Sequence, residues 1–438
     1  MIKNIFFTFC LIFSTITGVY AQSFQWQAIP NAPFDNSRHE DMMFLNSKTG
    51  WVVNYAGPVY KTTNGGVRFD TLYRNLNLYC RSVGFLDANT GIVGTLDPSH
   101  SLYRTTNGGA NFSLVTNVPA PVPTGICGIT QLPPNIFYAV GKYGGPAFAI
   151  KSTDKGATWI NLHIDTSQAT RLVDTYFNDS LHGFIIGNKG GANYEQGKAI
   201  ILYTSDGGVT WVNKYMGTTI GYLSWKIDFR GDSFGYVSCE NFNGNPPGYL
   251  FTTDGGMNWS FHTIPNAPTL NLEGIGFLNP STGWVGGWTP DFQAGPTFQT
   301  TNGGVNWFQV TFGKALNRFQ FFGDTLAYVC GQTIYKYSLI TAIHQISSAI
   351  PDNFKLEQNY PNPFNPSTKI KFSVSHTSFI ELNVYDNTGK EITVLHSGTL
   401  QSGEYETTFN GESFSTGIYF VRLSAENFVE TKRIMLIK

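Results

Sequence analysis

Cysteine, charge and histidine are all scarce in this chain of 438 residues. It holds five cysteines and no Cys-x-x-Cys pair, which excludes a disulfide-dense scaffold and argues against a structural zinc site. Only 13% of the residues are charged and the net charge is −1, so we expect no surface for nucleic acid. The eight histidines show no metal-ligand spacing, and we therefore expect no metal and no cofactor.

Long apolar runs are also missing after the first 21 residues. Residues 1–21 open with Lys3, continue with a largely apolar stretch from Ile5 to Ile16, and end in small residues before Gln22. This pattern is typical of a secretory signal peptide, and its apolar part is too short for a stable membrane span. We expect residues 1–21 to be removed on export and the mature chain to contain no membrane span.

Four cysteines remain after the signal peptide: Cys80, Cys127, Cys239 and Cys330. Cys80 and Cys127 occupy matching places in successive repeats, so a disulfide between them is one interpretation. The other is that all four are small buried apolar side chains.

Glycine and aromatic residues, by contrast, are abundant and recur in a short motif. The 47 glycines and the 15% of aromatic residues suit many short strands joined by tight turns. The motif is Ser/Thr-x-Asp/Asn-x-Gly, closed by an aromatic residue, and its six acidic or amide members are Asn64, Asn107, Asp154, Asp206, Asp254 and Asn302. An Asp or Asn side chain can bond backbone N–H groups two residues on, and glycine permits a positive φ. We therefore expect a structural turn between two strands at each copy, rather than a catalytic site.

The spacing of the motif predicts a ring of similar sheets. Successive copies lie 43, 47, 52, 48 and 48 residues apart, which suits a four-stranded unit that must stack on its neighbours. Seven such units open with a strand that ends in an aromatic residue or leucine: Phe44, Phe85, Leu132, Phe177, Phe229, Phe277 and Phe322. The seventh lacks a fourth strand, and residues 24–29 resemble the missing one. The prediction is an all-β, seven-bladed β-propeller over residues 22–338, closed by its own N-terminal segment.

The repeat resembles the Asp-box, or bacterial neuraminidase repeat, of sialidases, sortilin-type receptors and photosystem II assembly factor-like propellers. The resemblance covers residues from about 24 to 338. It implies a β-propeller, and because the repeat occurs in enzymes and in non-catalytic proteins alike, it leaves the function open.

A different pattern begins after a predicted linker at residues 339–353. Residues 354–438 alternate apolar and polar positions between turn signals, which predicts a small Ig-like antiparallel β-sandwich. The stretch from Leu356 to Pro366 and the ending from Lys432 to Lys438 resemble the type A sorting domain of the type IX (Por) secretion system. The resemblance implies the type IX machinery as a partner and a secreted or outer-surface location.

Function is expected at the mouth of the ring opposite the motif turns, where loops carried by rigid strands come together. The candidate ligand-binding residues that enter the inner strands are Arg38, Arg81, Arg171, Trp225 and Arg318. Three longer loops, at residues 188–199, 240–248 and 288–297, add Tyr194, Phe242, Trp288 and Phe292. Exposed aromatic residues suit a glycan or a protein. Two alternatives stay open: the charges pair with one another as a solvated rim, and the longer loops carry no function.

The interpretation we favour is an exported, non-catalytic protein that binds an unidentified glycan or protein outside the cell. The alternative is a glycoside hydrolase, sialidase-like or polysaccharide-degrading, with Asp41 and Glu273 as its carboxylates. The resemblance to sialidases implies three arginines and a Tyr–Glu pair. However, the Phe/Tyr-Arg-Ile-Pro signature is absent, and no tyrosine partner for Glu273 is visible from the spacing.

Overall fold

The computed structural model describes residues 23–34, 37–73, 78–264, 266–267, 270–289, 291, 293–340, 343–412 and 414–438. The expected signal peptide and Phe292 lie outside these residues. The chain divides into two compact units, Gln25–Ser338 in one and Leu339–Lys438 in the other. Apart from the short 3-10 helix η1 (Tyr194–Gln196), the elements of the described residues are strands, and the all-β class is confirmed.

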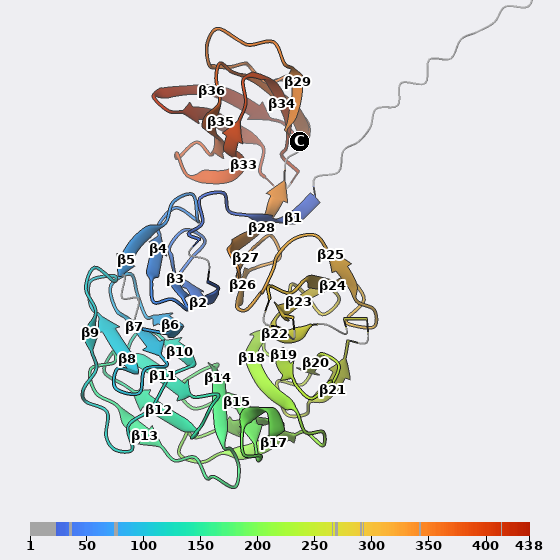
Figure 1. Ribbon diagram of the computed structural model, residues 1–438. Helices are drawn as coiled ribbons and strands as arrows, with labels where there is room; N and C mark the ends of the chain where they lie inside the picture. Colours follow the sequence, from blue (N-terminus) through green and yellow to red (C-terminus); the bar gives the residue numbers. More distant parts are fainter. Residues whose placement is uncertain are drawn as a thin grey trace, which may run out of the picture. The chain divides into compact units, whose positions relative to one another are not determined.

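The first unit contains seven four-stranded sheets in its described residues, arranged as a ring in Figure 1. In six of them the strands follow chain order. These six are β2 (His39–Phe44), β3 (Gly50–Asn54), β4 (Val59–Thr62) and β5 (Asp70–Tyr73); β6 (Cys80–Phe85), β7 (Gly91–Thr95), β8 (Leu102–Thr105) and β9 (Ser113–Leu114); β10 (Gly128–Leu132), β11 (Ile136–Gly141), β12 (Phe148–Ser152) and β13 (Ile160–Leu162); β14 (Arg171–Phe177), β15 (Gly183–Lys189), β16 (Lys198–Thr204) and β17 (Val212–Met216); β18 (Tyr222–Arg230), β19 (Phe234–Asn241), β20 (Gly248–Thr252) and β21 (Ser260–Thr263); and β22 (Asn271–Phe277), β23 (Gly283–Trp288), β24 (Thr297–Thr300) and β25 (Phe308–Val310).

The seventh sheet takes one strand from the other end of the unit. Its order is β1-β28-β27-β26, with β26 (Phe319–Phe322), β27 (Leu326–Cys330), β28 (Ile334–Ile340) and β1 (Ser23–Ala28). Trp26 of β1 lies 5.3 Å from Phe312, between ring centroids, and 5.5 Å from Trp284 of the sixth sheet. The N-terminal segment thus lies where the sequence predicts it, and the apolar area that its indole buries holds it there.

The six motif turns share one set of hydrogen bonds and join the third and fourth strands of their sheets. In each, the first hydroxyl accepts a bond of 2.8–3.0 Å from the N–H of the motif glycine. The Asp or Asn oxygen accepts one of 2.9–3.0 Å from the N–H four residues on, rather than the two expected. The glycines have φ between +78° and +96°, a region that other residues resist. Each turn is therefore held by its own residues.

The turns also tie neighbouring sheets together. An aromatic side chain from the second strand of one sheet donates a hydrogen bond to a glycine carbonyl in the turn of the next sheet. The bonds are Trp51 Nε1 to Gly108 O at 3.1 Å, Tyr138 Oη to Gly207 O at 3.4 Å, and Tyr328 Oη to Gly65 O at 3.2 Å. The last of these joins the seventh sheet to the first, so the ring closes through the same contact that builds it.

Cys80, Cys127, Cys239 and Cys330 are buried and free. The disulfide interpretation of Cys80 and Cys127 is therefore wrong, and the apolar one holds. Burial raises the pKa of Cys80, Cys239 and Cys330 to about 12, because an apolar setting disfavours a thiolate.

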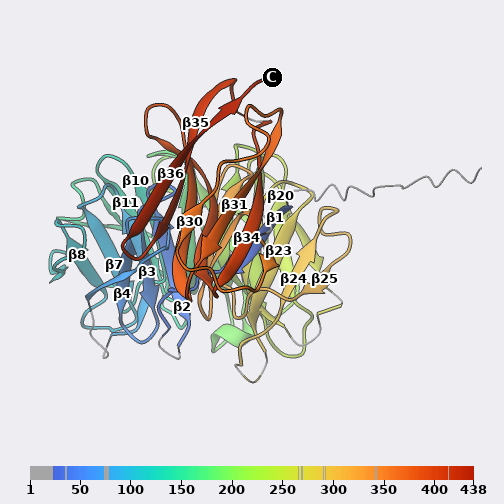
Figure 2. The ribbon, with the colours of Figure 1, turned by 90° about the horizontal axis from the view of Figure 1, so that it is seen from above.

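The second unit contains two four-stranded sheets around one apolar core. One has the order β29-β34-β31-β30, and Figure 2 shows β31 and β34 side by side. The other has the order β33-β32-β35-β36. The strands are β29 (His344–Ser347), β30 (Lys355–Leu356), β31 (Ser367–Val374), β32 (Ser378–Tyr385), β33 (Glu391–Leu400), β34 (Gly403–Asn410), β35 (Gly417–Ala425) and β36 (Phe428–Leu436). Strand β29 falls inside the predicted linker and pairs with β34, a contact between residues far apart that the local sequence does not signal.

Candidate functional site

Most inner strands of the ring contain a β-bulge near their beginning, where one or two residues have no partner in the second strand. The pairing shifts between His39 and Asp41, Cys80 and Ser82, Leu172 and Asp174, Ser224 and Ile227, and Leu272 and Gly274. The residues skipped by these shifts are Glu40, Arg81, Val173, Trp225, Lys226 and Glu273. A bulge re-aims a side chain, and here it brings polar groups from different sheets into contact.

Glu40 is the centre of the first of two charged networks. It accepts hydrogen bonds from Arg38 Nε at 3.2 Å and Arg38 Nη2 at 2.8 Å, from Arg81 Nη1, and from Asn317 Nδ2 at 3.1 Å. Arg38 also pairs with Glu273 of the sixth sheet. Burial alone would raise the pKa of Glu40, but the two guanidinium groups outweigh it and hold that pKa below its usual range. This carboxylate is ionised and fully engaged.

Arg318 is the centre of the second network and reaches across the ring. It directly precedes β26 of the seventh sheet, and its Nε donates to Asp41 Oδ1 of the first sheet at 2.8 Å. Its Nη2 donates to Asp174 Oδ1 of the fourth sheet, also at 2.8 Å. The other carboxylate oxygens accept backbone N–H groups, at 3.2 Å from Val83 and 3.1 Å from Ile227. Asp41 and Asp174 are buried, and Arg318 shares the neutralisation of these two carboxylates with the buried Lys226, which interacts electrostatically with both.

Glu273 of the first network and the neighbouring Glu240 both have raised pKa values. Burial raises the pKa of Glu273, against the opposing effect of Arg38. Burial and the neighbouring Glu273 raise the pKa of Glu240 well above its usual range, while Asn271 Nδ2 donates to Glu240 Oε1 at 3.2 Å. Two adjacent carboxyls cannot both ionise cheaply in a buried place.

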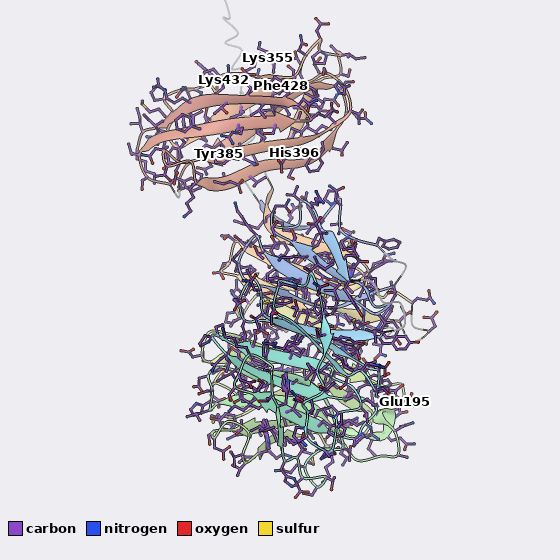
Figure 3. The ribbon with its side chains drawn as sticks, turned by 90° about the vertical axis from the view of Figure 1, so that its left-hand side faces the viewer. Glu195, Lys355, Tyr385, His396, Phe428 and Lys432 are labelled. Atoms are coloured by element: carbon purple, nitrogen blue, oxygen red, sulfur yellow. The ribbon has the colours of Figure 1, made fainter. Side chains whose placement is uncertain are left out.

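Aromatic side chains gather next to Arg81 and form what we call the aromatic patch: Tyr55, Tyr79, Tyr143, Tyr194 and Phe242. Ring centroids are 5.1 Å apart for Tyr55 and Tyr79, 5.5 Å for Tyr143 and Tyr194, and 5.3 Å for Tyr194 and Phe242. Tyr194 lies on η1, and the next residue of this helix, Glu195, is labelled in Figure 3. Tyr55 and Tyr79 are exposed, at 38% and 49% of their full area.

The patch rests on Arg81 and Trp225. The Arg81 guanidinium lies 4.9 Å from the Trp225 ring and 5.8 Å from that of Tyr143, which are cation–π distances. Burial raises the pKa of Tyr143; Arg81 opposes the rise, and Tyr55 and Tyr194 add to it, so both parts of the patch lie near this hydroxyl. Arg81 Nε and Trp225 Nε1 are buried donors without a hydrogen-bond partner in the described part of the chain.

The structure distributes the predicted site residues unevenly. Arg38, Arg81, Trp225 and Arg318 belong to the two networks or support the patch, and Tyr194 and Phe242 belong to the patch itself. Trp288 contacts the first network, where the Arg38 guanidinium lies 4.4 Å from its ring centroid.

Arg171 does not join these groups. It donates to Gly190 O at 2.8 Å and Gly191 O at 3.3 Å, and so holds its own loop. The sequence reasoning missed Tyr55, Tyr79 and Tyr143. The signal that could have found them is an aromatic residue in a short loop that follows or precedes an inner strand of the ring.

The described residues contain no group of three or more His, Cys, Asp or Glu side chains placed to hold a metal ion. Within the same residues, no helix is both long and apolar enough to cross a membrane.

Comparison with known families and structures separates the two units. Residues 358–438 match the family model of the secretion system C-terminal sorting domain. This segment is a type IX sorting domain. It directs the chain through type IX secretion to the cell surface or the exterior, which confirms the predicted tail and destination. No curated protein matches the chain.

The first unit is similar in fold to solved β-propellers. The structure of YCF48 from Cyanidioschyzon merolae is 19% identical with a TM-score of 0.53, and covers 72% of this chain and 98% of its own. That of YCF48 bound to D1 peptide is 16% identical with a TM-score of 0.52, and covers 72% of this chain and 96% of its own. At these identities the likeness concerns the fold alone.

Proposed function

We propose that this protein is exported, has no catalytic activity, and binds an uncharged saccharide chain at the aromatic patch. In this proposal residues 1–21 are the signal peptide and residues 22–338 form a seven-bladed Asp-box propeller. Residues 339–353 connect it to an Ig-like sandwich at 354–438 that carries the sorting function. Seven four-stranded sheets and six motif turns with the same two backbone hydrogen bonds support the propeller.

The observation that carries the proposal is a contrast between two kinds of side chain: the arginines are paired with carboxylates, whereas the tyrosine rings are exposed. Arg38 and Arg81 are buried, the Arg318 side chain is 16% exposed, and all three already bind carboxylates of their own chain. They are poorly placed to grip a substrate carboxylate, as the resemblance to sialidases would require. Tyr55 and Tyr79, in contrast, offer exposed ring faces, on which the apolar face of a pyranose ring can pack.

Polar groups close to the patch suit hydroxyl-rich ligands. The tyrosine hydroxyls of the patch can donate or accept hydrogen bonds. One of the solved propellers of similar fold, YCF48, is bound to a D1 peptide, so a peptide is the ligand to test against a saccharide.

A glycoside hydrolase is the second candidate, and one observation favours it. Glu240 and Glu273 are neighbours with raised pKa values, and a carboxyl kept protonated can act as a general acid. Asp41, the other carboxylate considered from sequence, is instead held by Arg318 and the Val83 N–H. If an enzyme, the protein would use Glu240 and Glu273.

Binding by the purified full chain tests the proposal. On an array of neutral and anionic glycans we expect binding to neutral ones, and about tenfold weaker binding by Tyr79→Ala, because an exposed aromatic anchor is lost. Phe308→Ala is a matched control, since Phe308 is 47% exposed on β25 and Tyr79 is 49% exposed. Equal affinity of the two variants would contradict the assignment of the patch. Binding of a peptide but of no glycan, lost in Tyr79→Ala, would retain the patch and replace the ligand.

A further inference from the structure

A strap of residues 356–366 joins the two sheets of the sorting domain. At one end, Tyr360 pairs with Lys369 of β31, and each N–H donates to the other's carbonyl at 3.0 Å. At the other end, Phe364 N donates to Met435 O and Ile437 N donates to Phe364 O, both at 2.9 Å. The strap therefore lies along the free edge of β36, the last strand of the chain.

Polar side chains of the strap satisfy that edge. Asn362 Oδ1 accepts a bond from Met435 N at 3.0 Å, and Gln358 Nε2 donates to Arg433 O at 2.9 Å. An uncovered edge strand would offer its backbone groups to any passing chain. These amide side chains thus have a structural role, as does Phe364, which is 2% exposed and lies 5.7 Å from the Phe409 ring.

The ring of Tyr360, unlike that of Phe364, is not buried in the core of the sorting domain. The backbone of Tyr360 is fixed, yet its side chain is 80% exposed, the largest value among the large apolar side chains of the described residues. Pro361 and Pro363 follow it, both exposed, and Ile437, bonded to Phe364, is 45% exposed. Proline fixes φ, so this surface loses little conformational entropy when a partner covers it.

We propose that Tyr360, Pro361, Pro363 and Ile437 form the surface by which the type IX secretion machinery recognises this chain. The complementary surface is an apolar pocket on a protein, wide enough for an aromatic ring. The sorting-domain match begins in the strap, at residue 358, and ends at residue 438, two residues after β36, and the fold brings these two segments together. The proposal rests on the sorting domain and is independent of any ligand of the aromatic patch.

Export of the full chain from a bacterium with a type IX system tests this surface. The measured quantity is the fraction of the chain in the medium or open to protease on intact cells. We expect Tyr360→Ala to lower it about tenfold or more, and Tyr360→Phe to restore it. Val429→Ala is the control, because Val429 is 63% exposed on β36, the strand that the strap lies along, and should export normally. The melting temperature of purified Tyr360→Ala should equal that of the parent.

Three results would overturn the proposal. Normal export of Tyr360→Ala is the first. Equal loss of export in Tyr360→Ala and Val429→Ala is the second. The third is a lowered melting temperature with loss of export, which would make Tyr360 a structural residue. If Tyr360→Ala exports normally but shifts a dimer to a monomer in sedimentation, the surface is a contact between copies.

Discussion

The motif turns and the centre of the ring use the same carboxylate groups in opposite ways. In the turns, Asp154, Asp206 and Asp254 sit near water and accept hydrogen bonds from their own neighbours in sequence. At the centre, Glu40, Asp41 and Asp174 are buried and bind cations that are 2 to 277 residues away in sequence. The first arrangement is local and repeats; the second occurs once and depends on the closed ring. Polar residues thus define the turns between strands in the first region, and they hold different sheets together in the second.

The largest expected effect comes from removing the cation that spans the ring. Arg318→Met removes the guanidinium that bonds both Asp41 and Asp174 and leaves the buried Lys226 as the cation near the two carboxylates, which should lower the free energy of unfolding by about 3–5 kcal/mol. Urea denaturation of the full chain measures it. Arg68→Met is the control, because the Arg68–Asp70 pair has a short distance of 2.6 Å but side chains that are 77% and 54% exposed. A surface pair of this kind contributes under about 1 kcal/mol. Similar losses in the two variants would remove the distinction between centre and surface.

A turn glycine should give the next largest effect. Gly208 has φ +93°, and a Cβ there would lie 2.6 Å from Leu162 Cδ1, so Gly208→Val should cost about 1–3 kcal/mol. Gly231 has φ +70° and no atom within 4 Å of the added Cβ. Gly231→Val therefore measures backbone strain alone. A Gly208 variant no less stable than the Gly231 variant would show that the turn does not pack as described.

The smallest effect is a change in pH dependence. Hydrogen bonds from the backbone and side chain of Asn258, and from Thr252, lower the pKa of Asp254 to about 2, below the ~3.9 of an unfolded aspartate. The folded state therefore gains stability above about pH 4 that is lost as the pH falls towards 2. Asp254→Asn, which copies Asn64, Asn107 and Asn302, should keep the turn and reduce this loss. Melting temperatures between pH 2 and 5 measure it, and an unchanged acid slope would contradict the assigned pKa.

Sequence reasoning succeeded where the determinants are local. The Asx turns and the strand period depend on residues within one repeat. The missing strand of the seventh sheet was found because residues 24–29 resemble the fourth strands of other repeats. It failed where side-chain direction depends on a bulge or on a distant partner. Arg171 and Arg81 look equivalent in sequence, but Arg171 bonds the carbonyls of its own loop while Arg81 bonds Glu40 of another sheet. Tyr143 was missed because its importance comes from Trp225 and Tyr194, which are neighbours only in the folded ring.

Turnover of a bound glycan tests the central claim most directly, namely that the buried charges hold the ring together and perform no chemistry. The neutral glycan bound best by the parent would be incubated with the parent and with Glu273→Gln, and released reducing ends would be counted. We predict no release above the buffer rate in either sample, with binding retained by the parent. Release by the parent that is abolished in Glu273→Gln would contradict the account and make the Glu240–Glu273 pair a catalytic centre.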